Sequence, residues 1–440
     1  MKVGDIGSVM RAAQKGDADA QFRLANHYLS RRQNQLADQW MNKAAALGHE
    51  RAQLFCAVSI LAAPGNGKRL TEACEFLVTI VDTGHPEANF LLANQLYLGD
   101  GIEIDLDRAR HCLETAVRAE LPAAWRVLAM LHAGHSSNAD TAMSCFYKAA
   151  SLGDPFAQYA AAARLFKLDI RTRKEDIVVR WLENASMRGV YLARILLEEI
   201  RTQEGETGSF RIQDLVEETT IEQAMAFEWP EPRKLSLTVI AESPLVAEAS
   251  NALRKEECDY IVSFAHPALS ASRAIDPSTG KSVRNPVRTS SGMNFSLTFK
   301  DIVVGFVERT MAAAAGLPMV NGEPLAVLHY QPGEEYKPHF DAFLPNDPGA
   351  QKMLAMGGQR AKTVLVYLND NFEGGATDFP NRAVKVEPEA GKLLLMENCN
   401  ADGTPSQFGL HAGLPVTEGE KWLASMWMRE QAFRNLMIDE

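Results

Sequence analysis

The stretch "YKPHFDAF", residues 336–343, places a histidine and an aspartate two residues apart within an otherwise aromatic and apolar segment. In an extended strand, residues i and i+2 lie on the same face, so His339 and Asp341 would converge on one point in space. A converging imidazole and carboxylate suggest a metal site. On these residues alone, a histidine–aspartate hydrogen bond within a sheet is the simpler interpretation.

A third candidate ligand, His411, lies 70 residues after Asp341, and Lys421 follows ten residues later. Two histidines and one carboxylate form the facial triad of non-heme Fe(II) oxygenases, and Zn²⁺ accepts the same donors. Lys421 favours iron, because a cation inside an apolar barrel is costly unless an anion pairs with it. The distal carboxylate of 2-oxoglutarate, whose keto-acid end chelates the iron, would be that anion.

The sequence around these residues is typical of short strands. Two helical segments, 245–265 and 299–317, precede β-branched and aromatic runs that are interrupted by Gly, Pro, Asn and Asp. These runs are PLAVLHYQ, AKTVLVYLND, AVKVEPEAGKLLLMEN and EKWLASMWMRE. Helices followed by many short strands predict a β-sandwich or jelly roll flanked by helices.

From about residue 235 to 430 the chain resembles the prolyl 4-hydroxylase branch of the Fe(II)/2-oxoglutarate dioxygenases. The similar motifs are YQPGEEYKPHFDAF, RAKTVLVYLNDNFEGGATDFP, VEPEAGKLLLMEN and LHAGLPVTEGEKWLASMWMR, with KEECDYIVSFAHPALSASRAID and VRTSSGM upstream. The resemblance implies an α+β double-stranded β-helix, or jelly-roll, oxygenase domain. It also implies Fe(II), 2-oxoglutarate and O2, with ascorbate (vitamin C) as a reductant.

The family's roles transfer to matching positions. By this resemblance His339, Asp341 and His411 are the iron ligands, and Lys421 is the salt-bridge partner of 2-oxoglutarate. Halogenating relatives replace the ligand carboxylate with a small residue, so the presence of Asp341 indicates a hydroxylase.

Four further residues are candidates for contact with the cosubstrate or the substrate. Tyr330 and Thr363 are expected to contact 2-oxoglutarate. Trp427 shares strand parity with Lys421 and so points into the same cavity, either as core or as a substrate wall. Arg288 could close over a bound peptide or be an isolated surface arginine.

The reaction that the resemblance implies is oxidative decarboxylation of 2-oxoglutarate to succinate and carbon dioxide, coupled to hydroxylation of an unactivated C–H bond. A prolyl residue of a protein or peptide is the expected substrate, because the family takes extended proline-containing chains. One alternative is a hydroxylase of a free amino acid or small metabolite. The other is a protein-interaction scaffold with a vestigial oxygenase domain, against which the intact ligand set and Lys421 argue.

The first 200 residues repeat the phrase G-x-x-x-A at glycines 16, 48, 84, 153 and 189, with Glu120 in the remaining place, in steps of 32 to 36 residues. Such a period predicts stacked helix–turn–helix units in which the glycine ends one helix; a bundle with chance periodicity is the alternative. The segments KAAALGHERAQ and YKAASLGDPFAQYAAAARL resemble Sel1-like repeats, relatives of the tetratricopeptide repeat. Members of that family usually act as protein-interaction scaffolds, so a protein substrate could dock on this α-helical solenoid.

The predicted organisation is multidomain. A Sel1-like helical repeat domain covers 1–200, an acidic linker or capping segment covers 201–232, and the oxygenase domain covers 233–440. The formal net charge of −11 argues against nucleic acid and anionic membrane as partners. Because no apolar run has the length of a signal peptide or a membrane span, a cytoplasmic location is expected.

Overall fold

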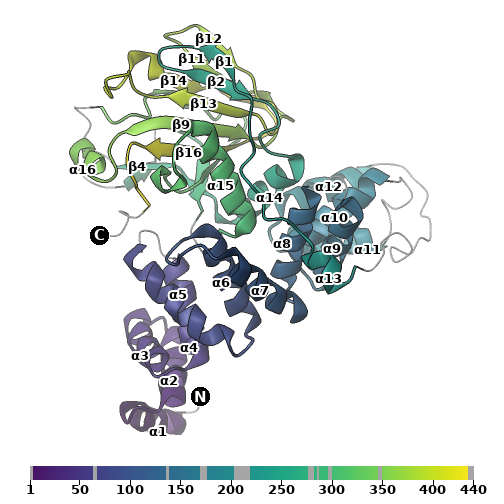
Figure 1. The fold of residues 1–440 in the computed structure, drawn as a ribbon, viewed down its shortest axis with the longest axis vertical. Helices are drawn as coiled ribbons and strands as arrows, with labels where there is room; N and C mark the ends of the chain where they lie inside the picture. Colours follow the sequence, from purple (N-terminus) through teal and green to yellow (C-terminus); the bar gives the residue numbers. More distant parts are fainter. Residues whose placement is uncertain are drawn as a thin grey trace. The chain divides into compact units, whose positions relative to one another are not determined.

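The fold is described from a computed structural model. It describes residues 3–62, 67–134, 138–168, 176–202, 219–275, 282–284, 287–295, 300–344 and 349–434. The chain, drawn in Figure 1, divides into two compact units: the described residues of 3–124 and 300–301 belong to one, and the described residues of 125–295 and 302–434 belong to the other. Most of the expected linker, residues 203–218, lies outside the described residues.

The first unit is a helical repeat array. Each helix contacts its neighbours in sequence, as expected for a solenoid in which repeats stack side by side. The helices are α1 (Val3–Gln14), α2 (Ala18–Ser30), α3 (Asn34–Ala46), α4 (Glu50–Ala62), α5 (Gly67–Val81), α6 (Pro86–Leu98) and α7 (Leu106–Arg118). The repeated alanines Ala52, Ala88 and Ala124 are fully buried, because a methyl group lets adjacent helices approach closely. In the same unit, the buried Lys300 ammonium donates to Asp100 at 2.8 Å.

The repeated glycines adopt the left-handed conformation that ends a helix. Their φ angles lie between 77° and 94°, and Glu120, which replaces glycine in one repeat, has a φ of 56°. After α7 the Glu120 amide donates to the Val117 carbonyl, and the Leu121 amide donates to Ala116. This is the Schellman arrangement, so the repeat phrase marks helix C-termini, as predicted.

Glu120→Gly is therefore expected to raise the free energy of unfolding of the repeats by about 0.5–1 kcal/mol, because glycine removes the left-handed strain but is more flexible when unfolded. Gly153→Ala is the reverse control, because a Cβ at that position has no heavy atom within 4 Å and introduces backbone strain alone. Denaturant unfolding followed by circular dichroism measures both. A Glu120→Gly protein less stable than the parent would contradict the assignment.

The second unit begins within the repeats and includes the remaining helices. These are α8 (Pro122–Ala133), α9 (Ala139–Ser151), α10 (Pro155–Leu168), α11 (Asp176–Met187), α12 (Tyr191–Thr202) and the short α13 (Ile221–Met225). Helix α14 (Lys255–Ala265), from the oxygenase half of the chain, packs against α10 and α12. The rings of Phe156 and Tyr260 meet edge to face at 4.8 Å, and the Tyr159 hydroxyl donates to Asp259 at 2.9 Å.

The oxygenase half contains two main antiparallel sheets. The eight-stranded sheet has the order β1-β2-β13-β9-β16-β7-β6-β3, and the four-stranded sheet has the order β12-β11-β14-β8. The strands of the large sheet are β1 (Thr238–Ala241), β2 (Val246–Ala249), β3 (Ser270–Ala271), β6 (Ser291–Asn294), β7 (Ala326–Tyr330), β9 (Arg360–Tyr367), β13 (Leu393–Glu397) and β16 (Lys421–Arg429). Those of the small sheet are β8 (Tyr336–His339), β11 (Thr377–Phe379), β12 (Val384–Val386) and β14 (His411–Gly413).

Two short strand pairs and two helices complete this half. The pairs are β4 (Arg273–Ile275) with β5 (Ser282–Arg284), and β10 (Glu373–Gly374) with β15 (Val416–Glu418); the helices are α15 (Ile302–Ala315) and α16 (Ala350–Ala355). Helix α15 lies against β9 and β16 (Figure 1).

The core of the oxygenase half draws side chains from both main sheets. Leu328, Leu365 and Leu423 of the large sheet share one buried cluster with Phe379 and Val386 of the small sheet. The predicted jelly roll flanked by helices is thus confirmed. Among the described residues, no helix combines the length and the apolar character needed to cross a bilayer.

Candidate active site

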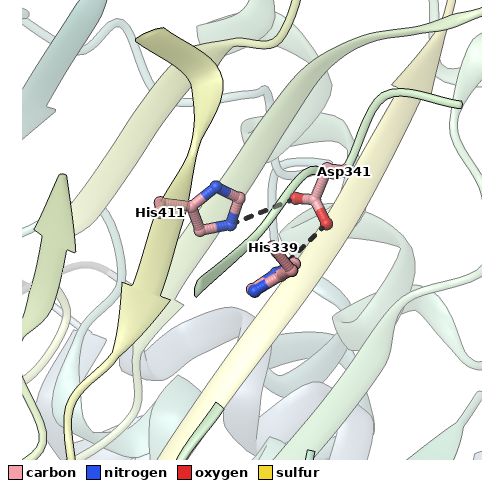
Figure 2. Close-up of side chains that lie close together, drawn as sticks. All are labelled: His339, Asp341 and His411. Carbon is pink, nitrogen blue, oxygen red and sulfur yellow. Dashed lines mark ion pairs between the residues drawn. The ribbon is translucent and has the colours of Figure 1, made fainter. Parts of the chain in front are cut away.

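Two histidines on neighbouring strands and one aspartate form the centre of the site. His339 ends β8, His411 begins β14, and the two residues face each other across the antiparallel pair. Figure 2 shows both imidazole rings beside the Asp341 carboxylate. Nε2 of His339 lies 3.6 Å from Oδ1 of Asp341, and Nε2 of His411 lies 3.5 Å from Oδ2.

The donor set fits a divalent metal ion. The ligand atoms of the three residues lie within 4.8 Å of one another. Nδ1 of His339 lies 2.9 Å from the Lys337 carbonyl, and Nδ1 of His411 lies 2.9 Å from the Gly409 carbonyl. Each Nδ1 must carry a proton to donate to a carbonyl, which leaves the Nε2 lone pairs available to a metal.

Burial and neighbouring groups shift the pKa values of two of the candidate ligands, Asp341 and His411. Burial lowers the pKa of His411, which favours the neutral imidazole. Burial alone would raise the pKa of Asp341, but His411, His339 and Arg360 outweigh it and hold that pKa below its ordinary value. The site therefore presents the Asp341 carboxylate beside a His411 imidazole whose neutral form is favoured by burial.

The Thr363 hydroxyl orients Asp341. It donates to Oδ2 of Asp341 at 2.7 Å, and the Asn398 side-chain amide donates to the Thr363 oxygen at 2.9 Å. The structure places the Thr363 hydroxyl against the candidate metal ligand, and the expected contact of Thr363 with the cosubstrate stays a prediction. Such partners fix the orientation of a ligand carboxylate.

Lys421 lies in the same cavity as the three candidate ligands. Its side chain is buried, and Nζ donates to the Gly375 carbonyl at 2.6 Å between the rings of Tyr330 and Tyr367. Burial lowers the pKa of Lys421 to about 7. Among the described residues no carboxylate forms an ion pair with this ammonium, so the cavity carries a cation that suits an anionic ligand.

The predicted strand parity is confirmed along β16. Lys421, Leu423, Ser425 and Trp427 all line the cavity, as expected for alternate residues of one strand. Tyr330, directly opposite Lys421 on β7, lines it as well.

The two candidate substrate residues sit differently. Trp427 lines the cavity with its Nε1 atom buried and without a hydrogen-bond partner, and the Arg360 guanidinium lies 4.3 Å from its ring. Arg288 lies 5.4 Å from the ring of Tyr336, which itself stacks on His339 at 3.4 Å. Arg288 is therefore linked to the candidate ligand His339 through the Tyr336 ring.

Sequence reasoning missed Tyr336, Arg360 and Glu323 as residues around the site. Arg360 forms two hydrogen bonds with Glu323, at 2.6 and 2.7 Å, and this pair backs Trp427. Tyr336 was detectable, because it begins the same short stretch that contains His339 and Asp341. The Arg360–Glu323 pair joins residues 37 apart and has no local signal.

Comparisons with known proteins identify both halves of the chain. Residues 325–429 match the 2OG-Fe(II) oxygenase superfamily, and residues 18–49, 86–120 and 128–154 match the Sel1 repeat. Prolyl 4-hydroxylase 1 of Arabidopsis thaliana is 36% identical over 208 residues, which cover 44% of this chain and 72% of that protein. Probable prolyl 4-hydroxylase 6 of the same plant is 38% identical over 200 residues, covering 41% and 67%.

Two solved structures resemble different parts of the chain. A viral collagen prolyl hydroxylase from Paramecium Bursaria Chlorella virus-1 is 25% identical with a TM-score of 0.34, covering 43% of this chain and 98% of that one. A Sel1 repeat protein from Oxalobacter formigenes is 22% identical with a TM-score of 0.36, covering 44% and 58%. From the extent and identity of its plant relatives, and from the oxygenase match that spans the candidate ligands, the chain belongs to the prolyl 4-hydroxylase family of 2OG-Fe(II) oxygenases.

Proposed function

We propose that this protein is an Fe(II)- and 2-oxoglutarate-dependent hydroxylase that acts on a prolyl residue of a protein or peptide. The observation that carries the proposal is the single cavity that holds His339, Asp341 and His411 together with the buried Lys421 ammonium. The named plant relatives are prolyl 4-hydroxylases, which supports the substrate class.

In the proposed mechanism His339, Asp341 and His411 would hold the iron, which when bound would activate O2, the oxidant that converts 2-oxoglutarate to succinate and carbon dioxide and hydroxylates a C–H bond. Thr363 keeps the Asp341 carboxylate turned toward the two imidazoles. Lys421, with Tyr330 beside it, binds the distal carboxylate and so fixes the orientation of the cosubstrate. The apolar walls, Leu328, Leu423 and their neighbours, keep water out of the site.

Trp427 is proposed as a wall of the substrate site, with its unpartnered Nε1–H available to a carbonyl of the substrate. Arg288, which lies over the Tyr336 ring, is proposed to position the substrate beside that ring. Ascorbate as a reductant and a cytoplasmic location stay predictions.

The test combines the purified protein with Fe(II), 2-oxoglutarate and proline-containing peptides, followed by mass spectrometry. The expected product is a prolyl residue heavier by one oxygen atom, formed together with succinate. Free proline and other free amino acids are the competing substrates. Hydroxylation of a free amino acid in preference to every peptide would replace this proposal with the small-molecule alternative.

The repeats of the first unit are proposed to recruit the protein substrate. Sel1 repeats match within that unit at residues 18–49 and 86–120. In the second unit, α14 packs on α10 and α12 and so occupies surface that the later repeats would otherwise offer. Docking at a separate site raises the effective concentration of a substrate without altering the chemistry.

The affinity for 2-oxoglutarate is expected to fall as pH rises above about 7. Burial lowers the pKa of Lys421 to about 7, and only the ammonium form pairs with the incoming carboxylate. The dissociation constant should be flat just below pH 7 and rise up to about tenfold per pH unit above it, because binding must then include protonation of Lys421. Isothermal titration calorimetry between pH 6.5 and 9, with Mn(II) in place of iron, measures this.

Lys421→Arg is the control for the pH profile, because a guanidinium stays protonated across that range. A parent protein whose affinity is independent of pH from 6.5 to 9 would contradict the role of Lys421.

A further inference from the structure

The residue just before the strand that carries Lys421 is hydrogen-bonded to the last repeat helix. The Tyr191 hydroxyl, at the start of α12, donates to Oε2 of Glu420 at 2.5 Å. Glu420 immediately precedes Lys421, the first residue of β16. Both residues of this hydrogen bond belong to the second compact unit, although 229 positions separate them in sequence.

The same carboxylate is shared with a histidine from the neighbouring strand. Nε2 of His329, on β7, lies 2.9 Å from Oε2 of Glu420. Burial would raise the pKa of Glu420, but the hydrogen bonds from Tyr191 and His329 outweigh it and lower that pKa. Glu420 is therefore an ionised acceptor, and hydrogen bonds to an ionised acceptor are among the stronger ones in proteins.

Aromatic rings extend this contact onto the face of the sheet opposite the cavity. Trp422 stacks on His329 with ring centroids 4.2 Å apart, and the Tyr191 ring lies 5.6 Å from Trp422. In the β16–β7 register Trp422 faces His329, and Lys421 faces Tyr330. The pair that contacts the repeat helix is thus the immediate neighbour of the pair proposed to bind 2-oxoglutarate.

The backbone at this point is hydrogen-bonded to the side chain of Asn369. The Asn369 side-chain amide donates to the Glu420 backbone carbonyl at 2.7 Å, and the Trp422 backbone amide donates to Oδ1 of Asn369 at 2.8 Å. Gly419, just before, has a φ of 74°, which marks a turn. β16 therefore begins directly after a turn. Its first residues are held through the backbone by Asn369 and through the Glu420 side chain by Tyr191 and His329.

We propose that helix α12 of the Sel1-like repeats is a positioning element of the cosubstrate site, in which Tyr191, acting through Glu420, holds the start of β16 and thereby the Lys421 ammonium. The inference rests on the proposed function, since it assigns Lys421 to 2-oxoglutarate. The repeats would then contribute to cosubstrate affinity in addition to any role in recruiting a partner.

The test compares two tyrosine variants of the full-length protein. Tyr191→Phe removes one hydrogen bond to Glu420, which keeps His329 as a partner. Tyr159→Phe is the matched control: it removes a hydrogen bond from a repeat helix to Asp259 on α14, and Asp259 keeps Lys255 as a partner. Both variants lose one hydroxyl between the repeats and the oxygenase half, but only the first contact reaches β16.

Tyr191→Phe should raise the dissociation constant and the KM for 2-oxoglutarate about fivefold with little change in kcat, whereas Tyr159→Phe should change neither, because coupling between residues in one network is of this order. Calorimetry with Mn(II) and no oxygen gives the dissociation constant independently of turnover. Hydrogen exchange should show faster exchange of the first amides of β16 in Tyr191→Phe alone. In a Glu420→Ala background, Tyr191→Phe should have no further effect on the dissociation constant.

Equal dissociation constants for the two tyrosine variants and the parent would overturn the inference and leave the proposed function standing. A parent protein that binds no 2-oxoglutarate would overturn both. A loss of kcat and stability in Tyr191→Phe without a change in cosubstrate affinity would assign the contact a purely structural role and likewise overturn the inference.

Discussion

Replacing either His339 or His411 with alanine is expected to lower 2-oxoglutarate-dependent succinate formation by more than about 100-fold, because even residues that only orient metal ligands cost up to that factor when removed. Each substitution leaves two of the three donors that surround the proposed iron position. Bound iron should fall in parallel with activity. Metal analysis of protein reconstituted with Fe(II) without oxygen, together with a succinate assay, measures both.

His27→Ala is the control for this pair. His27 lies in α2 of the first unit, where its side chain is outside the candidate site. All three variants should retain the far-ultraviolet circular dichroism of the parent, because His339 and His411 lie at strand ends. Full succinate production by both site variants would show that the metal assignment is wrong.

Lys421→Ala is expected to raise the KM for 2-oxoglutarate by about 30-fold or more, because truncating one partner of a buried charge pair costs about 2–5 kcal/mol. The Lys421 ammonium is buried, and the cavity walls beside it are largely apolar, so water screens the pair poorly. Iron content should stay near that of the parent, since Lys421 is not one of the three clustered donors. Steady-state succinate kinetics at saturating iron give the KM.

Lys362→Ala is the matched control, because that lysine lies on the adjacent strand β9 and pairs with Glu397 away from the cavity. Its KM should equal that of the parent. If Lys421→Ala also leaves the KM unchanged, the distal carboxylate binds elsewhere.

Much of the site could be predicted because strand geometry is periodic. His339 and Asp341 converge as predicted, although β8 ends at His339 and Asp341 lies in a bend just after it, and the parity of Lys421 and Trp427 holds along β16. The repeats could also be predicted, since a left-handed helix terminus recurs every 32 to 36 residues even where Glu120 replaces glycine.

The contacts that sequence reasoning missed join segments without a shared period. Thr363 lies in β9 of the large sheet, whereas Asp341 follows β8 of the small sheet, so the contact of its hydroxyl with Asp341 depends on how the two sheets assemble. The Tyr191–Glu420 contact joins the two predicted domains, and neither the repeat phrase around Tyr191 nor the oxygenase motif around Glu420 predicts it. Local patterns assign elements and faces, whereas these partners depend on how the elements assemble.

The packing of α14 on the later repeats determines where a chimera can join this chain to another protein. A chimera joined within residues 201–232 would separate Tyr260 from Phe156 and Asp259 from Tyr159, and so leave an aromatic surface bare to water. A junction after Ala124 would keep these contacts, and it would release the Lys300–Asp100 pair, whose charges water can solvate. The first part of the repeat array is therefore the part that can be replaced in a chimera, whereas the later repeats must stay with the oxygenase half.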